Sequence, residues 1–204
     1  MIDIFAVLCG LGGAVLITYQ LMSGMGAQVL FAWHPTLMSI GFLFFMTSGL
    51  VAYRSPYLQT SRTAARTVHI VLQVLGSLTV FAGLIIIIVN KLSLSPPHAH
   101  FQSAHSIMGL IAVVLVFIQF CTGLFKASMV PQKYLKWHGD VGHLGYVFGI
   151  AALILGLCEF FSSWKVPLQV AAVGLPTLAL GSVAHMYRKG GGNDKEAQYL
   201  LGGA

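Results

Sequence analysis

The chain has 204 residues, enough for one domain, and 57% of them are hydrophobic while only 8% are charged. An average globular protein has roughly 25% charged residues. A soluble fold with so few charges would expose large apolar patches, so the composition excludes an ordinary soluble domain and predicts a membrane protein. The net charge of +6 does not predict binding to nucleic acid, because the basic residues lie in short segments between apolar runs.

Six apolar stretches are long enough to cross a bilayer, which takes about 20 residues of helix. Residues 4–53 contain no charged side chain and can form two helices with a break near residues 23–26. The other stretches are residues 67–90, 103–125, 137–158 and 166–187, and Pro176 is expected to kink the last. Because short connections make successive helices antiparallel neighbours, the sequence predicts an all-α, integral membrane six-helix bundle with up-down topology over residues 1–189. The Gly-rich, polar segment 190–204 is predicted to be a disordered cytoplasmic tail.

Basic residues are divided unequally between the two ends of such a bundle. An even number of helices places both termini at one end, and nine of the eleven Lys and Arg residues fall there. These nine are Arg54, Arg62, Arg66, Lys126, Lys133, Lys136, Arg188, Lys189 and Lys195. Lys91 and Lys165 fall at the other end. The positive-inside rule therefore predicts cytoplasmic termini, and the sequence leaves open whether the membrane belongs to the endoplasmic reticulum, a vesicle or the cell surface.

Four histidines recur at intervals of 35, 36 and 33 residues, namely His34, His69, His105 and His138. They lie within the first two turns of the second, third, fourth and fifth predicted helices. Because the helices alternate in direction, His34 and His105 are expected at one depth near the outer face. His69 and His138 are likewise expected at one depth near the cytoplasmic face. Two imidazoles at one depth on facing helices can ligate one metal ion from opposite sides.

The predicted histidine pairs favour haem over zinc. Zinc usually takes four protein ligands, whereas the ring of a haem supplies four and leaves two axial positions for imidazole. The chain has no C-x-x-C-H segment for covalent attachment. We therefore expect two non-covalent, bis-histidine haems b held by the central four helices. His34 and His105 would ligate the non-cytoplasmic haem iron, and His69 and His138 the cytoplasmic one.

Two other histidines in the helices have simpler interpretations. A single histidine at a helix end is usually an interfacial residue, and His185 is expected to be one. His143 is the alternative to His138 as a ligand on the fifth helix, but it lies about 7.5 Å deeper along the helix axis. We expect His143 to be a packed or hydrogen-bonded core residue.

Around the four spaced histidines the sequence resembles the cytochrome b561 family, in its short branch of single-domain transmembrane reductases. The matching segments are Trp33-His34-Pro35 with Leu37, Met38 and Ser39; His69 with Leu72 and Gln73; His105 with Gly109; and His138 with Gly142, Gly145 and Tyr146. The resemblance spans roughly residues 30–160. It implies a transmembrane, ascorbate-dependent oxidoreductase of the monodehydroascorbate or ferric reductase type. Electrons would pass from cytoplasmic ascorbate through two haems b to a non-cytoplasmic acceptor, monodehydroascorbate radical or ferric iron.

The resemblance places a cation near the ascorbate site, where this chain has Arg66. Ascorbate is an anion at neutral pH, and a cleft lined with positive charge concentrates anionic substrates. The predicted donor-binding residues are Arg62, Arg66, Lys133 and Tyr134. On the other side, His98 and His100 are candidates for the outer acceptor, because neutral histidine binds metal ions, although a solvated loop is the simpler interpretation. No catalytic residue is predicted, because the cofactor supplies the redox chemistry.

Two other classes of function stay open at this point. The chain could be a haem-binding membrane subunit or sensor that works with a separate redox partner, which the sequence separates poorly from an enzyme. It could also be a metal-ion transporter, but the central helices have almost none of the acidic or polar ligands that this requires near mid-membrane. The expected partners are ascorbate, the outer acceptor and the lipid bilayer; a homodimer is compatible with the sequence, and nucleic acid is not expected.

Overall fold

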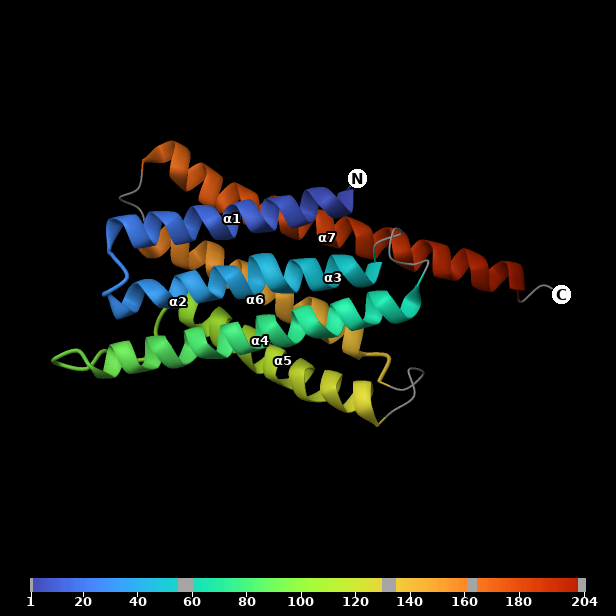
Figure 1. Ribbon diagram of the computed structural model, residues 1–204, viewed down its shortest axis with the longest axis horizontal. Helices are drawn as coiled ribbons and strands as arrows, with labels where there is room; N and C mark the ends of the chain where they lie inside the picture. Colours follow the sequence, from blue (N-terminus) through green and yellow to red (C-terminus); the bar gives the residue numbers. More distant parts are fainter. Residues whose placement is uncertain (1, 55–60, 130–134, 161–164, 202–204) are drawn as a thin grey trace.

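The computed structural model describes residues 2–54, 61–129, 135–160 and 165–201, and in these ranges all the regular secondary structure is helical (Figure 1). The elements are α1 (Ile2–Gly24), α2 (Leu30–Ser39), the π-helix η1 (Ile40–Met46), α3 (Thr47–Arg54), α4 (Arg62–Leu92), α5 (Ala104–Ser128), α6 (His138–Phe160) and α7 (Val166–Leu201). Because α2, η1 and α3 are continuous, they form one span, Leu30–Tyr53. Six helices in the described part are long and apolar enough to cross a membrane, which confirms the predicted all-α six-helix bundle.

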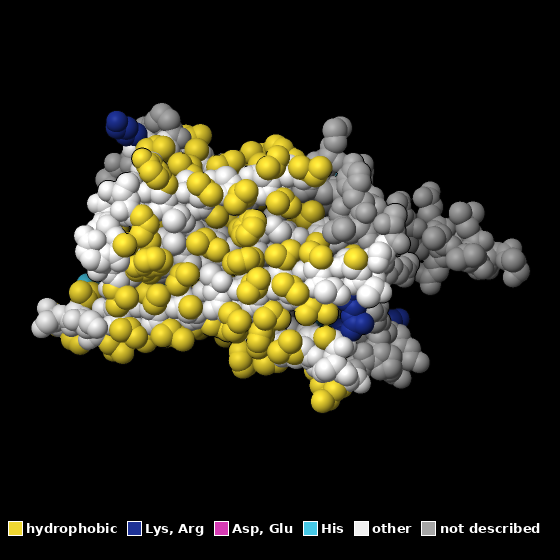
Figure 2. Space-filling view, viewed as in Figure 1, with side chains coloured by type: hydrophobic (Ala, Val, Ile, Leu, Met, Phe, Trp, Pro, Cys, Tyr) yellow, Lys and Arg dark blue, Asp and Glu magenta, His cyan; other side chains and the backbone are white. Residues whose placement is uncertain are grey.

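The spans alternate in direction, so the two termini lie toward the same end of the bundle (Figure 1). Large apolar side chains face outward in the middle of the bundle; Ile85 of α4 and Phe117 of α5 are 61% and 57% exposed. Figure 2 shows such side chains spread across the visible face, with Lys and Arg near its two ends. Lipid can cover this apolar surface, as the composition requires, whereas the side of the membrane that holds the termini stays a prediction.

The central helices are organised as two packed pairs. The second span packs along α4, and α5 packs along α6. We call the second span with α4 the first helix pair, and α5 with α6 the second helix pair. Helices α1 and α7 pack against each other, and both also contact the second span. The four spaced histidines lie between the two helix pairs.

The π-helix in the second span was not predicted from the sequence. Its wider turns bring the Phe42 ring against the backbone of Gly149 on α6, where a Cβ atom would collide with it. The Thr47 hydroxyl donates a hydrogen bond to the Phe42 carbonyl at 3.1 Å and pairs with the Tyr146 hydroxyl at 2.8 Å. Thr47 is 0% exposed and Tyr146 2%, so this polar bridge is fully buried. It joins the two helix pairs, and Tyr146 also lines a cavity described below.

The last helix is longer than its apolar part. Pro176 lies inside α7, and the helix continues to Leu201 through the Gly-rich segment that the sequence predicts to be disordered. A domain boundary at residue 189, with a separate tail after it, stays a prediction.

Candidate functional site: two histidine-lined cavities

Two cavities lie between the helix pairs, one toward each end of the bundle. The inner cavity, at the end where the termini lie, has a volume of about 300 Å³ and is lined by His69 and His138. The outer cavity has a volume of about 460 Å³ and is lined by His34 and His105. Both volumes lie in the range of cofactor pockets, roughly 300–1,000 Å³. The structure therefore groups the four spaced histidines two by two, as the helix alternation predicts.

The outer pair of imidazoles is close enough to share one metal ion. The ring centroids of His34 and His105 are 6.1 Å apart, and the ring planes are inclined by 80°. His34 Nδ1 lies 2.9 Å from the Gly83 carbonyl oxygen, and His105 Nδ1 lies 2.7 Å from that of Ala152. Because a carbonyl oxygen only accepts hydrogen bonds, each Nδ1 must carry the proton. The lone pair is then on Nε2, which is the protonation state of a ligating histidine.

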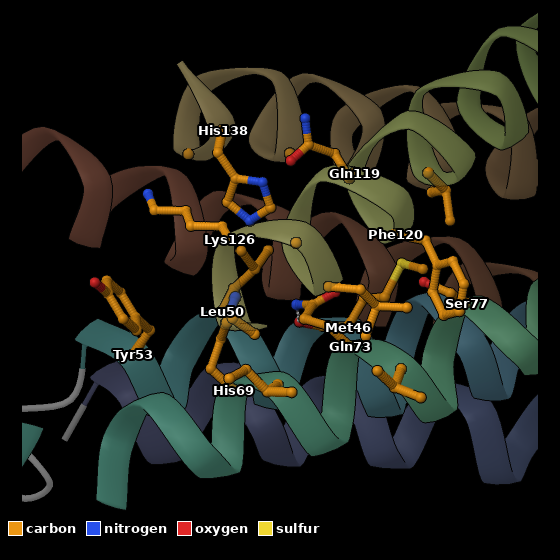
Figure 3. Close-up of a pocket in the computed structure, with 18 of the residues that line it drawn as sticks. Met46, Leu50, Tyr53, His69, Gln73, Ser77, Gln119, Phe120, Lys126 and His138 are labelled. Atoms are coloured by element: carbon orange, nitrogen blue, oxygen red, sulfur yellow. Dashed lines mark hydrogen bonds between the residues drawn. The ribbon is translucent and has the colours of Figure 1, made fainter. Parts of the chain in front are cut away.

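The inner pair faces across its cavity from opposite walls (Figure 3). His69 on α4 donates from Nδ1 to the Gly49 carbonyl oxygen at 2.9 Å, and its ring lies 5.2 Å from that of Tyr53. His138 on α6 is anchored differently, because its Nδ1 lies 3.4 Å from the Thr122 hydroxyl of α5. The Nδ1 contacts of both residues again leave Nε2 as the nitrogen for a metal.

Each histidine is anchored by the partner helix of its own pair and faces the opposite pair. In the first pair, His34 of the second span bonds to α4, and His69 of α4 bonds back to the second span. In the second pair, His105 of α5 bonds to α6, and His138 of α6 bonds back to α5. Each helix pair thus contributes one oriented imidazole to each cavity.

Glycine makes room for the imidazoles. Gly83 and Gly49 supply the carbonyl oxygens that His34 and His69 reach. A Cβ atom on Gly156 would lie 2.8 Å from the His105 ring, and one on Gly123 would lie 3.2 Å from His138 Cε1. Sequence analysis did not find these contacts, because the histidines and their glycines are far apart in the chain and the chain has 23 glycines.

The spacing of the outer histidine pair fits a haem with two axial imidazoles. A metal–imidazole bond of about 2 Å on each side, with about 1 Å from each nitrogen to its ring centre, gives roughly 6 Å between ring centres. The 6.1 Å separation of His34 and His105 matches that spacing for one shared ion. Among the residues described, no group of three or more His, Cys, Asp or Glu side chains could hold a metal.

A family model described as eukaryotic cytochrome b561 matches residues 33–163 of the chain. The matched segment contains all four spaced histidines and most of the residues that line both cavities. The chain belongs to the cytochrome b561 family. Cytochromes are haem proteins, so the family agrees with haem as the cofactor.

Curated proteins similar to this cytochrome b561 are named as reductases. The chain is 34% identical to the human transmembrane reductase CYB561D2, over 78% of its own length and 79% of that protein. It is 37% identical to the mouse transmembrane reductase CYB561D2 over 66% of the chain and 63% of that protein. It is 30% identical to a probable transmembrane ascorbate ferrireductase 4 of Arabidopsis thaliana over 76% of the chain and 67% of that protein.

The largely apolar wall of the inner cavity also carries three basic side chains. Arg66 lines it, but its Nη2 donates to the carbonyl oxygens of Lys126 and Ala127 at 3.4 and 3.3 Å, at the end of α5. Lys126 and Lys136 also line the cavity, and Lys126 Nζ donates to the Leu135 carbonyl oxygen at 3.4 Å. Of the other predicted donor residues, Lys133, Tyr134 and the side chain of Arg62 lie outside the described part of the structure.

Several residues that line the inner cavity were missing from the predicted site, among them Lys126, Gln73 and Gln119. Lys126 closes the fourth apolar stretch at the depth of His138, so depth matching could have found it. Gln73 and Gln119 are polar residues within apolar stretches, which is itself a signal of function in a membrane protein. Gln73 Nε2 donates to the Met46 carbonyl oxygen at 3.3 Å. The buried amide of Gln119 has no hydrogen-bond partner among the described residues.

The loop before α5 lies over the outer cavity. Two histidines of this loop, His98 and His100, line the cavity. The loop is folded back onto α4: the His98 N–H donates to the Lys91 carbonyl oxygen at 3.1 Å, and Lys91 Nζ donates to the Ala99 carbonyl oxygen at 2.9 Å. Phe101 follows in a left-handed conformation, with φ of 57°. This arrangement brings both predicted acceptor residues into the cavity of His34 and His105.

His143 and His185 are not among the described residues that line either cavity. The His143 ring lies 6.5 Å from that of Tyr146 in α6, and His185 lies half-buried in α7. The non-ligand roles expected for both residues stay predictions.

Proposed function

We propose that this protein is a transmembrane oxidoreductase that transfers electrons from cytoplasmic ascorbate, through two haems b, to a non-cytoplasmic acceptor. The acceptor is monodehydroascorbate radical or ferric iron. The observation that carries the proposal is the presence of two oriented histidine pairs, one toward each end of a membrane-spanning bundle. The name of the Arabidopsis relative, a probable ascorbate ferrireductase, supports the donor and the type of reaction.

In this proposal His34 and His105 hold the non-cytoplasmic haem, and His69 and His138 hold the cytoplasmic one. Each haem, when bound, supplies the one-electron redox chemistry. The chain positions the four imidazoles through their Nδ1 contacts and keeps both cavities inside the bundle. Phe42 against Gly149 and the Thr47–Tyr146 bridge fill the space between the cavities with protein.

Basic residues support ascorbate as the donor at the inner cavity. Arg66, Lys126 and Lys136 all line this cavity, so an anion at its mouth meets three cationic side chains. Arg66 has further N–H groups beyond those that bond to the end of α5, and they can bind an oxygen-rich anion. We include Arg62, Lys133 and Tyr134 in the donor site, on the sequence prediction alone.

At the opposite end, the loop over the outer cavity supports an acceptor site. His98 and His100 line that cavity together with Lys91. Neutral imidazoles can bind ferric iron, and histidine or lysine can donate hydrogen bonds to the oxygen atoms of monodehydroascorbate. Both substrates therefore remain within the proposal.

The test is an optical spectrum of the purified protein with and without ascorbate, combined with a pyridine haemochrome assay. We expect a low-spin haem b spectrum, two haems per chain and rapid partial reduction by ascorbate. One haem per chain, or none, would reject the two-centre proposal. Two haems that dithionite reduces but ascorbate does not would instead favour a haem-binding subunit or sensor with a separate redox partner.

The donor site is tested with Arg66→Gln, which removes the charge but keeps N–H groups for the end of α5. We expect reduction by ascorbate to slow by roughly tenfold at low salt, with a smaller effect at high salt, because screening weakens attraction between exposed charges. Reduction by dithionite should keep its wild-type extent. Lys165→Gln, at the other end of the bundle, is the matched control. An unchanged ascorbate rate in Arg66→Gln would show that the donor site is wrongly assigned.

A further inference from the structure

The four cavity histidines do not have equivalent hydrogen-bond partners. In the part of the chain that the structure describes, three of them bond from Nδ1 to a backbone carbonyl oxygen at 2.7 to 2.9 Å. His138 instead contacts the side-chain hydroxyl of Thr122, at the longer distance of 3.4 Å. Hydrogen bonds weaken as the distance grows beyond about 3.2 Å. His138 is therefore the most weakly anchored of the four.

The direction of the Thr122–His138 contact follows from where the hydroxyl proton goes. Thr122 Oγ1 donates to the Ile118 carbonyl oxygen at 2.7 Å, within the same helix. A hydroxyl has one proton, so Thr122 meets His138 with an oxygen lone pair. His138 must then donate from Nδ1, and its lone pair lies on Nε2. This nitrogen faces the wall of the inner cavity that carries His69 (Figure 3). The hydroxyl thus selects the same tautomer that the carbonyl groups select at the other three histidines.

A second contact holds the same ring. Gly123 follows Thr122 in α5, and a Cβ atom there would lie 3.2 Å from His138 Cε1. The ring therefore lies against the α5 backbone at Gly123 while Thr122 bonds to its Nδ1. Other threonines show that the bond within the helix is not what distinguishes Thr122: Thr177 donates to the Val173 carbonyl oxygen at 2.8 Å in the same way, on the exposed side of α7.

We propose that Thr122 is a positioning residue for the inner centre, setting the tautomer and ring orientation of His138 and making it the least electron-donating of the four imidazoles. This inference rests on the proposed function, in which His138 is an axial ligand. A strong Nδ1–H···O bond raises the basicity of Nε2, and a more basic axial ligand favours the oxidised iron. The outer centre then has two strongly anchored ligands, whereas the inner centre has one strong and one weak. The reduction potential of the inner centre is consequently open to adjustment through a single side chain.

The test compares Thr122→Val, Thr122→Ser and Thr177→Val in the purified, haem-loaded protein. The measurements are haem content, a redox titration followed optically, and electron paramagnetic resonance of the oxidised protein. In Thr122→Val we expect two haems, an upward shift of one of the two potentials, and a changed signal from one low-spin centre. His138→Ala, which should lack the inner centre, identifies that signal. Thr122→Ser keeps the hydroxyl and should restore wild-type values, and Thr177→Val should match the wild type.

The remaining outcomes each decide the proposal. Loss of the inner haem alone in Thr122→Val, with recovery in Thr122→Ser, would support the positioning role. Two haems with both signals and both potentials unchanged in Thr122→Val would overturn it. Equal changes at both centres, or changes that Thr122→Ser does not reverse, would also overturn it, because they indicate a general packing effect. Fewer than two haems in the wild-type protein would instead reject the proposed function itself.

Discussion

The outer and inner cavities are each lined by one histidine from each helix pair, but their other lining residues differ. In the outer cavity both imidazoles bond to backbone carbonyl oxygens, and a loop that carries His98 and His100 folds over the opening. The inner cavity has one imidazole on a carbonyl oxygen and one on the Thr122 hydroxyl. Its wall also holds two glutamines and three basic residues, Gln73, Gln119, Arg66, Lys126 and Lys136.

This difference distinguishes the contacts that hold the imidazoles from the side chains that surround them. Three of the four imidazoles are held by backbone carbonyl oxygens, so their orientation depends on helix packing rather than on a hydrogen-bonding side chain. The other side chains that line the two cavities differ. We infer that they give each cavity its own substrate and its own reduction potential, which substitutions can test.

The largest expected effect is the loss of one centre. His105→Ala removes an imidazole from the outer pair, so haem content should fall from two per chain to one, measured by the pyridine haemochrome assay. The inner signal in the electron paramagnetic resonance spectrum should persist, because His69 and His138 are anchored independently of His105. His69→Ala is the matched variant and should remove the inner centre alone. A His105→Ala protein that keeps two bis-imidazole centres would refute the pairing.

A smaller loss of haem is expected when alanine replaces one of the two glycines that lie against an imidazole, Gly156 or Gly123. Gly156→Ala places a Cβ atom 2.8 Å from the His105 ring, a distance that forces the ring to move, whereas Gly123→Ala places one at a tight 3.2 Å from His138. We therefore expect Gly156→Ala to lower occupancy of the outer centre strongly, and Gly123→Ala to lower that of the inner centre mildly. Haem content and the spectrum of each centre measure this.

Gly174→Ala is the control for both glycine variants, since the added Cβ would meet no heavy atom within 4 Å outside its chain neighbours and the nearby helix backbone. It should keep two haems per chain. If Gly123→Ala lost more haem than Gly156→Ala, the distances between glycine and imidazole would not be what limits the space for the rings.

The smallest expected effect concerns the protein between the cavities. Tyr146→Phe removes a buried hydroxyl that bonds to Thr47 at 2.8 Å, and Thr47 keeps its second bond to the Phe42 carbonyl oxygen. We expect a loss of about 1 kcal/mol in the free energy of unfolding, measured by thermal or denaturant unfolding in detergent. Both centres should keep their haems. Loss of the inner haem alone in this variant would show that Tyr146 acts on that centre rather than on the packing between helix pairs.

Much of the framework of the sites could be predicted from the sequence. The length of each apolar run determines the number of spans, and the alternation of helix direction then determines the depth of every residue. These properties belong to the chain read in order, so His34 could be matched with His105, and His69 with His138, without knowing any contact. The basic residues Arg66 and Lys136 could be assigned to the inner end for the same reason.

The contacts that orient those histidines required the tertiary structure. Gly83 lies 49 residues from His34, and Ala152 lies 47 residues from His105, so no local pattern connects a histidine with the carbonyl oxygen that holds it. The π-helix places Phe42 against Gly149, a residue more than 100 positions along the chain. Thr122 resembles any other threonine in an apolar helix until α6 places His138 beside it. Depth in a membrane is determined by position along the chain, whereas the environment of each imidazole is determined by which helices pack together.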